Sequence, residues 1–218
     1  MITENMRGLI KNGATIRAMF EEGKELARKY GKENVYDFSL GNPNVETPEE
    51  IKKLICEIVS EEDSLNLHGY MSNSGYEDVR KTIANSINKK YELNIDEQSI
   101  VMTCGAAGGL NIIFKSILEE GDEVIVFAPF FGEYSNYIKN FKGKEVIAST
   151  EENTFLPDVE DLKRNITERT KAVIINSPNN PTGVIYSSKV IEDICFVLKQ
   201  KQLEYNNDIY LIADEPYR

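Results

Sequence analysis

Small, aromatic and polar residues follow several apolar runs of this 218-residue chain, at positions where a ligand can be bound. Gly105, Ala106 and Ala107 follow the run SIVMT and open a helical stretch, and the free N–H groups of a helix start bind phosphate. Phe131 follows EVIVFA and can stack on a flat ring, with Phe130 as the alternative one residue earlier. These two segments predict sites for a phosphate and for a flat heteroaromatic ring.

Two further segments carry groups that form hydrogen bonds. Asn180 lies in SPNNPTG after the run AVIIN, and its amide can donate to a ligand oxygen. The two prolines restrict this loop, and either X-Pro bond is a candidate for the cis form. Asp214 ends the run DIYLIAD, where a carboxylate is costly unless a cationic group meets it.

Each segment also has an ordinary structural explanation when it is taken alone. A Gly-rich turn can serve tight strand–helix packing, a Phe after a strand is commonly part of the core, and an Asn-Pro pair commonly forms a turn. The chemistry therefore depends on whether the fold brings the segments together.

The pattern of apolar residues predicts the elements that position these segments. Short Val/Ile-rich runs alternate with helical stretches, which is typical of an α/β protein with a mostly parallel sheet flanked by helices. In such sheets, ligands bind at the carboxyl ends of the strands. Strands are predicted at 99–103, 123–128, 144–148, 172–176 and 208–214. Helices are predicted at 14–30, from residue 47, near 76–90, 106–119 and 133–140, within 156–166, and at 187–201.

The segment Thr47-Pro48-Glu49-Glu50 predicts a helix start in detail. Thr47 is the expected N-cap, Pro48 the first helical residue, and Glu50 the acidic partner of a capping box.

Composition and charge narrow the class of protein. The chain has 25 Lys and Arg against 36 Asp and Glu, a net charge of −11, so nucleic acid is an unexpected partner. Its three cysteines, an odd number without a CxxC motif, fit a reducing compartment better than disulfides or a zinc site. No stretch approaches the roughly 20 apolar residues of a membrane span, and the N-terminus has no apolar signal core. We expect a cytoplasmic protein with no membrane partner.

Taken in order along nearly the whole chain, the motifs resemble the N-terminal portion of the class I/II aminotransferases, pyridoxal-phosphate (PLP) enzymes of fold type I like aspartate aminotransferase. The segments that carry this resemblance are SLGNPNVETP, HGYMSNSGYEDVR, CGAAGG, PFF, SPNNPTG and ADEPYR. It implies transamination between an amino acid and a 2-oxo acid, with PLP as the cofactor.

The resemblance implies a role for each residue near the cofactor ring. Asp214 matches the acid that keeps the pyridine nitrogen protonated, and Phe131 matches the residue that stacks on the ring. Tyr217 and Asn180 match the two donors to the phenolic oxygen. Asp214 and Tyr217 are therefore the expected catalytic residues.

Further roles concern the phosphate, the subunit partner and the substrate. The backbone of Gly105, Ala106 and Ala107 is expected to hold the phosphate, without the hydroxyl residue that this family often has there. Tyr70 matches a tyrosine that reaches the phosphate of the neighbouring subunit, which implies a homodimer. The alternative is an ordinary loop aromatic.

The substrate carboxylate is expected near a loop in the first part of the chain and near Asn180. Gly41 and Asn42 match this loop, although a turn explains Asn42 nearly as well. His68, the only histidine, has no catalytic partner in the sequence and is expected to be structural.

The resemblance also predicts the domains and what this chain lacks. Residues 1–48 are expected to form an N-terminal arm and a segment of the small domain, and residues 49–218 an incomplete PLP-binding large domain. The Schiff-base lysine should follow DEPYR by a few dozen residues, beyond Arg218. We therefore expect the 218-residue chain to be inactive alone, and neither Lys189 nor Lys199 to replace that lysine.

Two alternatives stay open at this point. A PLP-dependent lyase, or a relative that decarboxylates its substrate, can use the same scaffold, because fold does not decide the reaction. A non-catalytic dimerisation or binding module that has lost its lysine is the other alternative.

Overall fold

The computed structural model describes residues 2–38, 41 and 45–217, apart from the side chains at 5, 9 and 11–17. Contacts divide the chain into two compact units, Met1–Tyr70 and Met71–Arg218, and we describe each by itself. The division between the units lies at residues 70 and 71, later in the chain than the predicted domain boundary at residue 48. The predicted N-terminal arm (1–48) and large domain (49–218) concern the whole protein and stay predictions.

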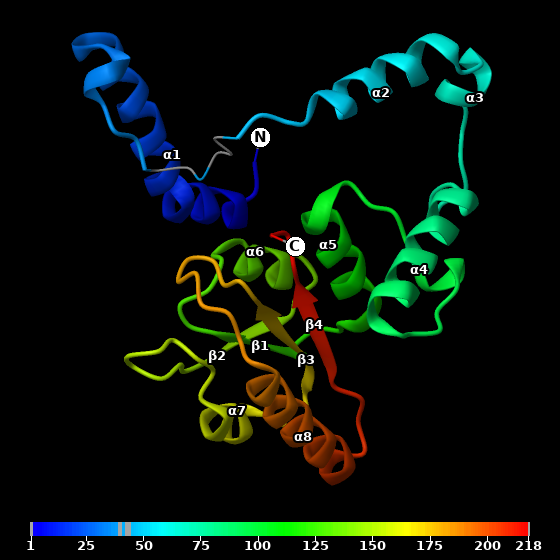
Figure 1. The fold of residues 1–218 in the computed structure, drawn as a ribbon. Helices are drawn as coiled ribbons and strands as arrows, with labels where there is room; N and C mark the ends of the chain where they lie inside the picture. The colour runs from blue at the N-terminus through cyan, green and yellow to red at the C-terminus, as the bar shows by residue number, and fades with distance from the viewer. Residues whose placement is uncertain (1, 39–40, 42–44, 218) are drawn as a thin grey trace. The chain divides into compact units, whose positions relative to one another are not determined.

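The first unit consists of helices in its described part (Figure 1). The helix expected at 14–30 begins earlier, at Glu4, where the Thr3 side chain caps it by accepting from Met6 N. It ends as expected at Gly31, whose φ of +88° suits glycine. The elements are α1 (Glu4–Tyr30), η1 (Lys32–Asn34), α2 (Glu49–Glu61) and α3 (Ser64–His68).

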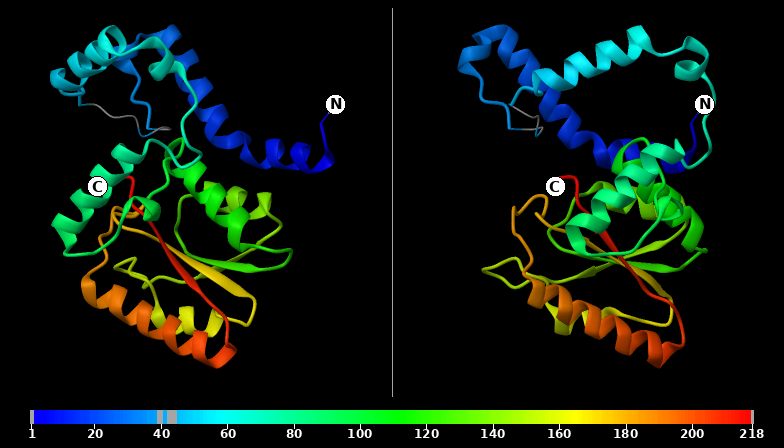
Figure 2. Two further views of the ribbon diagram at one scale, coloured as in Figure 1. Left: turned by 90° about the vertical axis from the view of Figure 1, so that its right-hand side faces the viewer. Right: turned by 45° about the vertical axis from the view of Figure 1, so that its right-hand side comes forward.

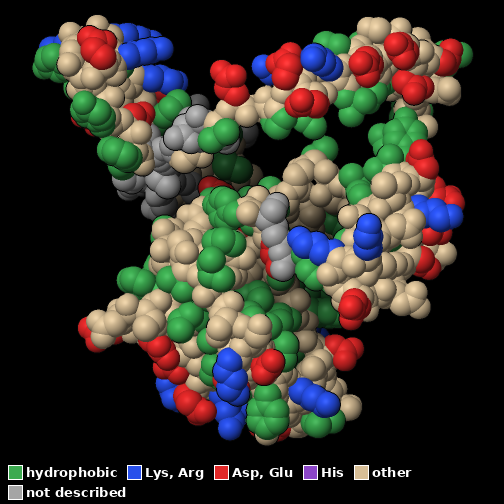
Figure 3. Space-filling view, viewed as in Figure 1, with side chains coloured by type: hydrophobic (Ala, Val, Ile, Leu, Met, Phe, Trp, Pro, Cys, Tyr) green, Lys and Arg blue, Asp and Glu red, His purple; other side chains and the backbone are tan. Residues whose placement is uncertain are grey.

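The start of α2 differs from the predicted capping box. The helix begins at Glu49 with Pro48 as its N-cap, and no side chain caps it. The prediction that Thr47 is the N-cap is wrong, because the chain turns into the helix one residue later than expected. The apolar side chains of α2 gather on one side of the helix and stay exposed (Figure 3). They include Ile51, Leu54, Ile55 and Ile58.

The second unit contains a four-stranded parallel sheet with helices on both faces (Figures 1 and 2). The strand order is β2-β1-β3-β4, and every neighbouring pair is parallel. This confirms the predicted α/β class. The strands are β1 (Glu123–Phe127), β2 (Lys144–Ala148), β3 (Thr170–Asn176) and β4 (Tyr210–Asp214). The helical elements are α4 (Glu77–Tyr91), η2 (Glu97–Ser99), α5 (Gly105–Ile117), α6 (Glu133–Asn140), α7 (Val159–Asn165) and α8 (Ser188–Tyr205).

Alternation along the strands builds two cores, one on each face of the sheet. In β1, Ile125 and Phe127 pack on the face covered by α7 and α8, while Val124 and Val126 pack on the face covered by α5 and α6. Burial of each such side chain stabilises the fold by about 1.5–3 kcal/mol. Because all five residues of β1 are buried, the strand is central, and its carboxyl end is fixed from both sides.

The segment 99–103 is not a strand, contrary to the prediction. Ile100, directly after η2, is extended, and Met102 N donates to Ser74 O in the loop before α4. A β-strand requires a neighbouring strand for its ladder, and none lies beside this segment in the described part of the chain.

Two residues of the stretch HGYMSNSGYEDVR hold this segment in place. Gly75 has a φ of +98°, and an added Cβ would lie 2.5 Å from Met102 Cγ, so only glycine fits. Arg80 is buried and donates to the backbone carbonyls of Gly75 and Glu97. These two positions of the motif therefore have a structural explanation.

Candidate active site

The order of the strands marks one crevice of the sheet. The connection from β1 to β2 passes over α6 on one face, and the connection from β2 to β3 returns over α7 on the other. The strand order therefore reverses between β1 and β3. Ligands of open α/β sheets bind at such a switch point, outside the carboxyl ends of the strands. Here those ends carry residues 128–131 and 177–180, with Asp214 at the end of the next strand.

The carboxylate of Asp214 is held by a tyrosine from another element. Tyr134, in α6, donates from its hydroxyl to Asp214 Oδ2 over 2.5 Å, although the residues lie 80 positions apart. Hydrogen bonds to ionised groups are short and strong. This contact orients the carboxylate at the tip of β4.

Tyr134 remains a hydrogen-bond donor over the whole working range of pH. Its side chain is only 2% exposed and belongs to the core on the α5 and α6 face. Burial, the hydrogen bond to Asp214 and the negative charge of that carboxylate together raise the pKa of the Tyr134 hydroxyl far above its ordinary value. Because the phenol keeps its proton, it donates and Asp214 accepts.

Asn176 joins the ends of β3 and β4 to the SPNNPTG loop. Its amide Nδ2 donates to the Asp214 carbonyl oxygen over 2.7 Å, and its Oδ1 accepts from Asn180 N over 2.6 Å. The side chain is 4% exposed, so both bonds form away from water.

The loop that carries Asn180 is fixed further by its own bonds. Asn179 Oδ1 accepts from both the backbone N–H and the hydroxyl of Thr182. Both predicted candidates for a cis bond, Ser177–Pro178 and Asn180–Pro181, are cis. Asn180 itself is partly buried and lies in the loop four residues after the end of β3.

The two phenylalanines after β1 have different surroundings. Phe130 packs against the core on the α5 and α6 face, whereas Phe131 is 36% exposed. The ring of Phe131 meets that of Tyr134 edge to face, with 5.6 Å between centroids. These surroundings favour Phe131 over Phe130 as the residue with a free ring face.

The start of α5 lies at the same end of the sheet as the tip of β4 (Figures 1 and 2). Cys104 is the N-cap and provides no side-chain cap. Gly105 N donates to Thr103 O over 2.9 Å, so an anion at this terminus would be bound by the N–H groups of Ala106 and Ala107. Gly105 has a φ of +72° and open space where a Cβ would stand, and Ala106 and Ala107 are exposed. This terminus can approach an anion closely.

Four predicted site residues are not placed against Asp214 by these contacts. Tyr217 follows β4 and is exposed. Tyr70 and Gly41 are exposed residues of the first unit, and Asn42 lies outside the described residues. The roles of these four residues stay predictions.

Sequence reasoning missed Tyr134 and Asn176. Asn176 ends an apolar strand, and the reasoning applied to Asp214, that such a polar group needs a partner, would have identified it. Tyr134 lies three residues after Phe131, one helical turn on, but its link to β4 is visible only in the fold.

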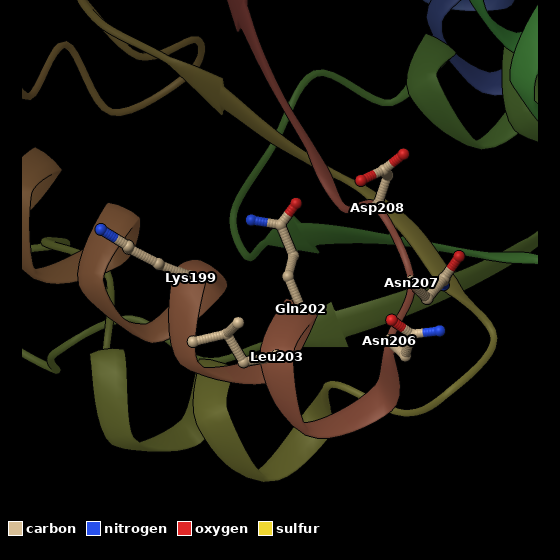
Figure 4. Close-up of a pocket in the computed structure, with 6 residues that line it drawn as sticks. All are labelled: Lys199, Gln202, Leu203, Asn206, Asn207 and Asp208. Atoms are coloured by element: carbon tan, nitrogen blue, oxygen red, sulfur yellow. The ribbon is translucent and has the colours of Figure 1, made fainter.

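A depression lies at the opposite end of the sheet, where α8 turns into β4 (Figure 4). It measures about 540 Å³, and Gln202 and Asn207 in its wall already bond the backbone of neighbouring segments. Lys199 lines this depression, and Lys189 pairs with Asp193 at the protein surface. Neither lysine is placed to serve the crevice at the carboxyl ends.

Two other classes of feature are absent from the part of the chain that the structure describes. No cluster of three or more His, Cys, Asp and Glu residues is arranged to hold a metal ion there. No described helix has the length and apolar character needed to cross a membrane.

Comparison with known proteins identifies the family. Residues 33–217 match the family model described as "Aminotransferase class I and II". The chain belongs to this family. Its curated relatives include an aspartate aminotransferase of Pyrococcus horikoshii and an aspartate/prephenate aminotransferase of Thermus thermophilus, each 32% identical over 97% of this chain. The chain spans about half of each relative, 50% and 54% of their lengths.

Solved structures of aminotransferases share the fold. One from Eubacterium rectale superimposes with a TM-score of 0.93 at 37% identity, covering 100% of this chain and 55% of its own. The Thermus thermophilus aspartate aminotransferase with maleate gives a TM-score of 0.78 at 30% identity, covering 93% of this chain and 50% of its own. Both confirm the sheet and helices of this family's fold.

Proposed function

We propose that this chain is the ring-binding portion of a PLP-dependent aminotransferase that transfers an amino group from an amino acid to a 2-oxo acid. The observation that carries this proposal is the carboxylate of Asp214, held by Tyr134 at the tip of β4, beside the switch point of the sheet. Family membership supports the reaction class.

The residues present fit PLP by the chemistry of their groups. Asp214 Oδ2 accepts from Tyr134, and a carboxylate has a second oxygen that can accept from a ring N–H. The exposed first turn of α5, with its small side chains, suits a phosphate. Phe131 would stack on the ring, while the amide of Asn180 and the hydroxyl of Tyr217 would donate to its phenolic oxygen.

When bound, PLP supplies an electron sink for the bond that breaks at the amino-acid Cα. The chain's own part is to bind, orient and hold charge. Asp214 would keep a proton on the ring nitrogen, and the hydrogen bond from Tyr134 would keep its carboxylate oriented. The turn at residues 105–107 would carry the phosphate, chiefly through the N–H groups of Ala106 and Ala107.

We propose that the Schiff-base lysine lies in the segment of the whole protein that corresponds to the part of the relatives not covered by this chain. Incubation of the 218-residue chain with one equivalent of PLP, followed by borohydride, should therefore give reversible binding and no labelled lysine in the mass spectrum. Asp214→Ala should weaken the reversible binding by about tenfold or more, because the ring nitrogen loses its ionic partner. A single labelled lysine, or PLP affinity unchanged in Asp214→Ala, would contradict the proposal.

The amino donor is open between aspartate, alanine and aromatic amino acids. Several relatives are named aspartate aminotransferases, so aspartate is the first donor to test. The protein made from the complete reading frame should convert aspartate and 2-oxoglutarate to oxaloacetate and glutamate. Release of ammonia instead of an amino-group transfer would indicate the lyase alternative, and the absence of any lysine at the ring would indicate the binding module.

We also propose a homodimer in which Tyr70 reaches the phosphate of the other subunit. Sedimentation velocity should show a dimer, and Tyr70→Phe should weaken PLP binding in the dimer.

The cytoplasm is the proposed location, since the three cysteines are free and exposed and a reducing compartment would keep them so.

A further inference from the structure

Asn176 is buried between the two strand ends that carry the proposed ring contacts. In the ladder of β3 and β4 it stands opposite Asp214, and its side chain adds a bond to the Asp214 carbonyl oxygen. The other end of the same amide accepts from the backbone N–H of Asn180. One planar group thus spans from one proposed contact residue to the other.

The geometry restricts this amide to a single orientation. Nδ2 must face the carbonyl oxygen of Asp214, because that oxygen accepts a hydrogen bond. Oδ1 must face the backbone N–H of Asn180, because that N–H donates one. A buried amide with both ends occupied is stiff, since any rotation leaves a donor and an acceptor without partners. The distance between the backbones of Asp214 and Asn180 is therefore set by the length of one side chain.

We infer that Asn176 is a positioning residue, which sets the spacing between the acid at the ring nitrogen and the amide at the phenolic oxygen. This inference rests on the proposed function for the identity of the ring. Asn176 need not touch the cofactor. It acts through Asp214 and Asn180, which face two different atoms of one rigid molecule, so an error in their spacing weakens both contacts together.

The test measures PLP affinity of the 218-residue chain by absorbance titration. Asn176→Ala should weaken binding about tenfold in the unmodified chain. In a chain that already carries Asp214→Asn and Asn180→Ala, the same substitution should cost less than about twofold, because the contacts it positions are gone. Equal losses in the two backgrounds would show general damage to the fold and overturn the inference, as would full affinity in Asn176→Ala.

One further variant separates the contributions of the two ends of the Asn176 amide, and a second variant is its control. Asn176→Asp keeps the oxygen that accepts from Asn180 but puts a second oxygen against the Asp214 carbonyl, so it should lose PLP affinity while the Asn180 N–H stays protected from hydrogen exchange. Asn179→Ala is the matched control, because the Asn179 side chain is also buried in this loop but bonds Thr182. It should leave protection of the Asn180 N–H unchanged.

Hydrogen exchange needs no cofactor, so it tests the positioning role of Asn176 separately from the proposed PLP binding. If the unmodified chain and Asp214→Asn bind PLP equally, the proposed function fails. If exchange of the Asn180 N–H is not at least tenfold faster in Asn176→Ala, the positioning role of Asn176 fails, whatever the chain binds.

Discussion

At the scale of single residues, the Tyr134–Asp214 pair links the core to the candidate site. The tyrosine ring fills the core on the α5 and α6 face, and its hydroxyl emerges from that core onto the carboxylate. Phe in its place keeps the ring and removes only the hydrogen bond. The pair can therefore be tested without creating a cavity.

Tyr134→Phe should lower the free energy of unfolding by about 1.5–3 kcal/mol at neutral pH, the usual contribution of a hydrogen bond to a charged group. Urea unfolding followed by circular dichroism measures this loss. Tyr137→Phe is the control, because it removes a phenolic hydroxyl from the same helix and leaves the pair in place. Equal losses in the two variants would contradict a special role for Tyr134.

Glu123, at the opposite end of β1, gives the stability of the fold a dependence on pH. Burial alone would raise the pKa of this carboxyl, but hydrogen bonds from Lys144 and Thr167, with the positive charges of Lys144 and Arg169, lower it below its ordinary value of 4.5. A carboxylate with a lowered pKa in the folded state contributes stability above the unfolded value. That contribution is lost as the pH falls through the folded pKa.

The midpoint temperature of thermal unfolding should therefore fall as the pH is lowered below about 4.5. This fall should be smaller in Glu123→Gln than in the unmodified chain. Thermal unfolding between pH 7 and pH 3 measures the difference. Glu120→Gln is the matched control, since Glu120 pairs with Lys142 while both side chains are largely exposed, and such pairs contribute little. A pH profile of Glu123→Gln that overlays the unmodified one would rule out this assignment.

At the scale of elements, the loop before α4 depends on one glycine. Gly75→Ala should lower the free energy of unfolding by more than about 1 kcal/mol, because the backbone is left-handed there and the new Cβ would strike Met102. Chemical denaturation of the purified variant measures the loss. Gly132→Ala should be neutral or stabilising, since Gly132 has a φ of −57° and open space around it.

The elements from α5 to β4 could be predicted from the sequence because each carries its own local signal. Each strand is a short run rich in apolar residues, mainly Val and Ile, and polar or glycine-containing turns separate the strands from the helices. The segment 99–103 has a similar apolar run and is not a strand, since a ladder depends on a neighbour that no local pattern reveals. The start of α1 was missed for the opposite reason, because apolar spacing is weak before residue 14 while Thr3 still caps the helix.

The same division between local and distant information applies to the site. Asp214, Asn180 and Phe131 were predicted because each lies at or soon after the carboxyl end of a strand, and parallel strands bring these ends to one edge. Tyr134 was not predicted, because its partner lies 80 residues away and its helix shows only ordinary amphipathic spacing.

At the scale of the whole molecule, β4 is an edge strand in the described part of the chain, paired with β3 alone. An open edge presents unpaired N–H and C=O groups to other chains. The 218-residue chain should therefore self-associate beyond a dimer as its concentration rises, and Tyr210→Lys should reduce this association. Light scattering across a concentration series measures it.

Leu203→Lys is the control for that experiment. It replaces an exposed apolar side chain of α8, so it lowers the apolar surface without placing a charge on β4 itself. If both substitutions reduce association equally, general surface hydrophobicity rather than the edge of β4 is responsible.

The place of Tyr134 in both the core and the candidate site has a consequence for the substitutions that this chain can accept. A substitution that improves packing at this position also changes the electrostatic surroundings of Asp214, and one that tunes the acid also disturbs a close-packed interior. Residue 134 can therefore be replaced only by side chains that both fill the core and donate to Asp214. Substitutions that alter the properties of the site are easier at positions whose side chains face solvent.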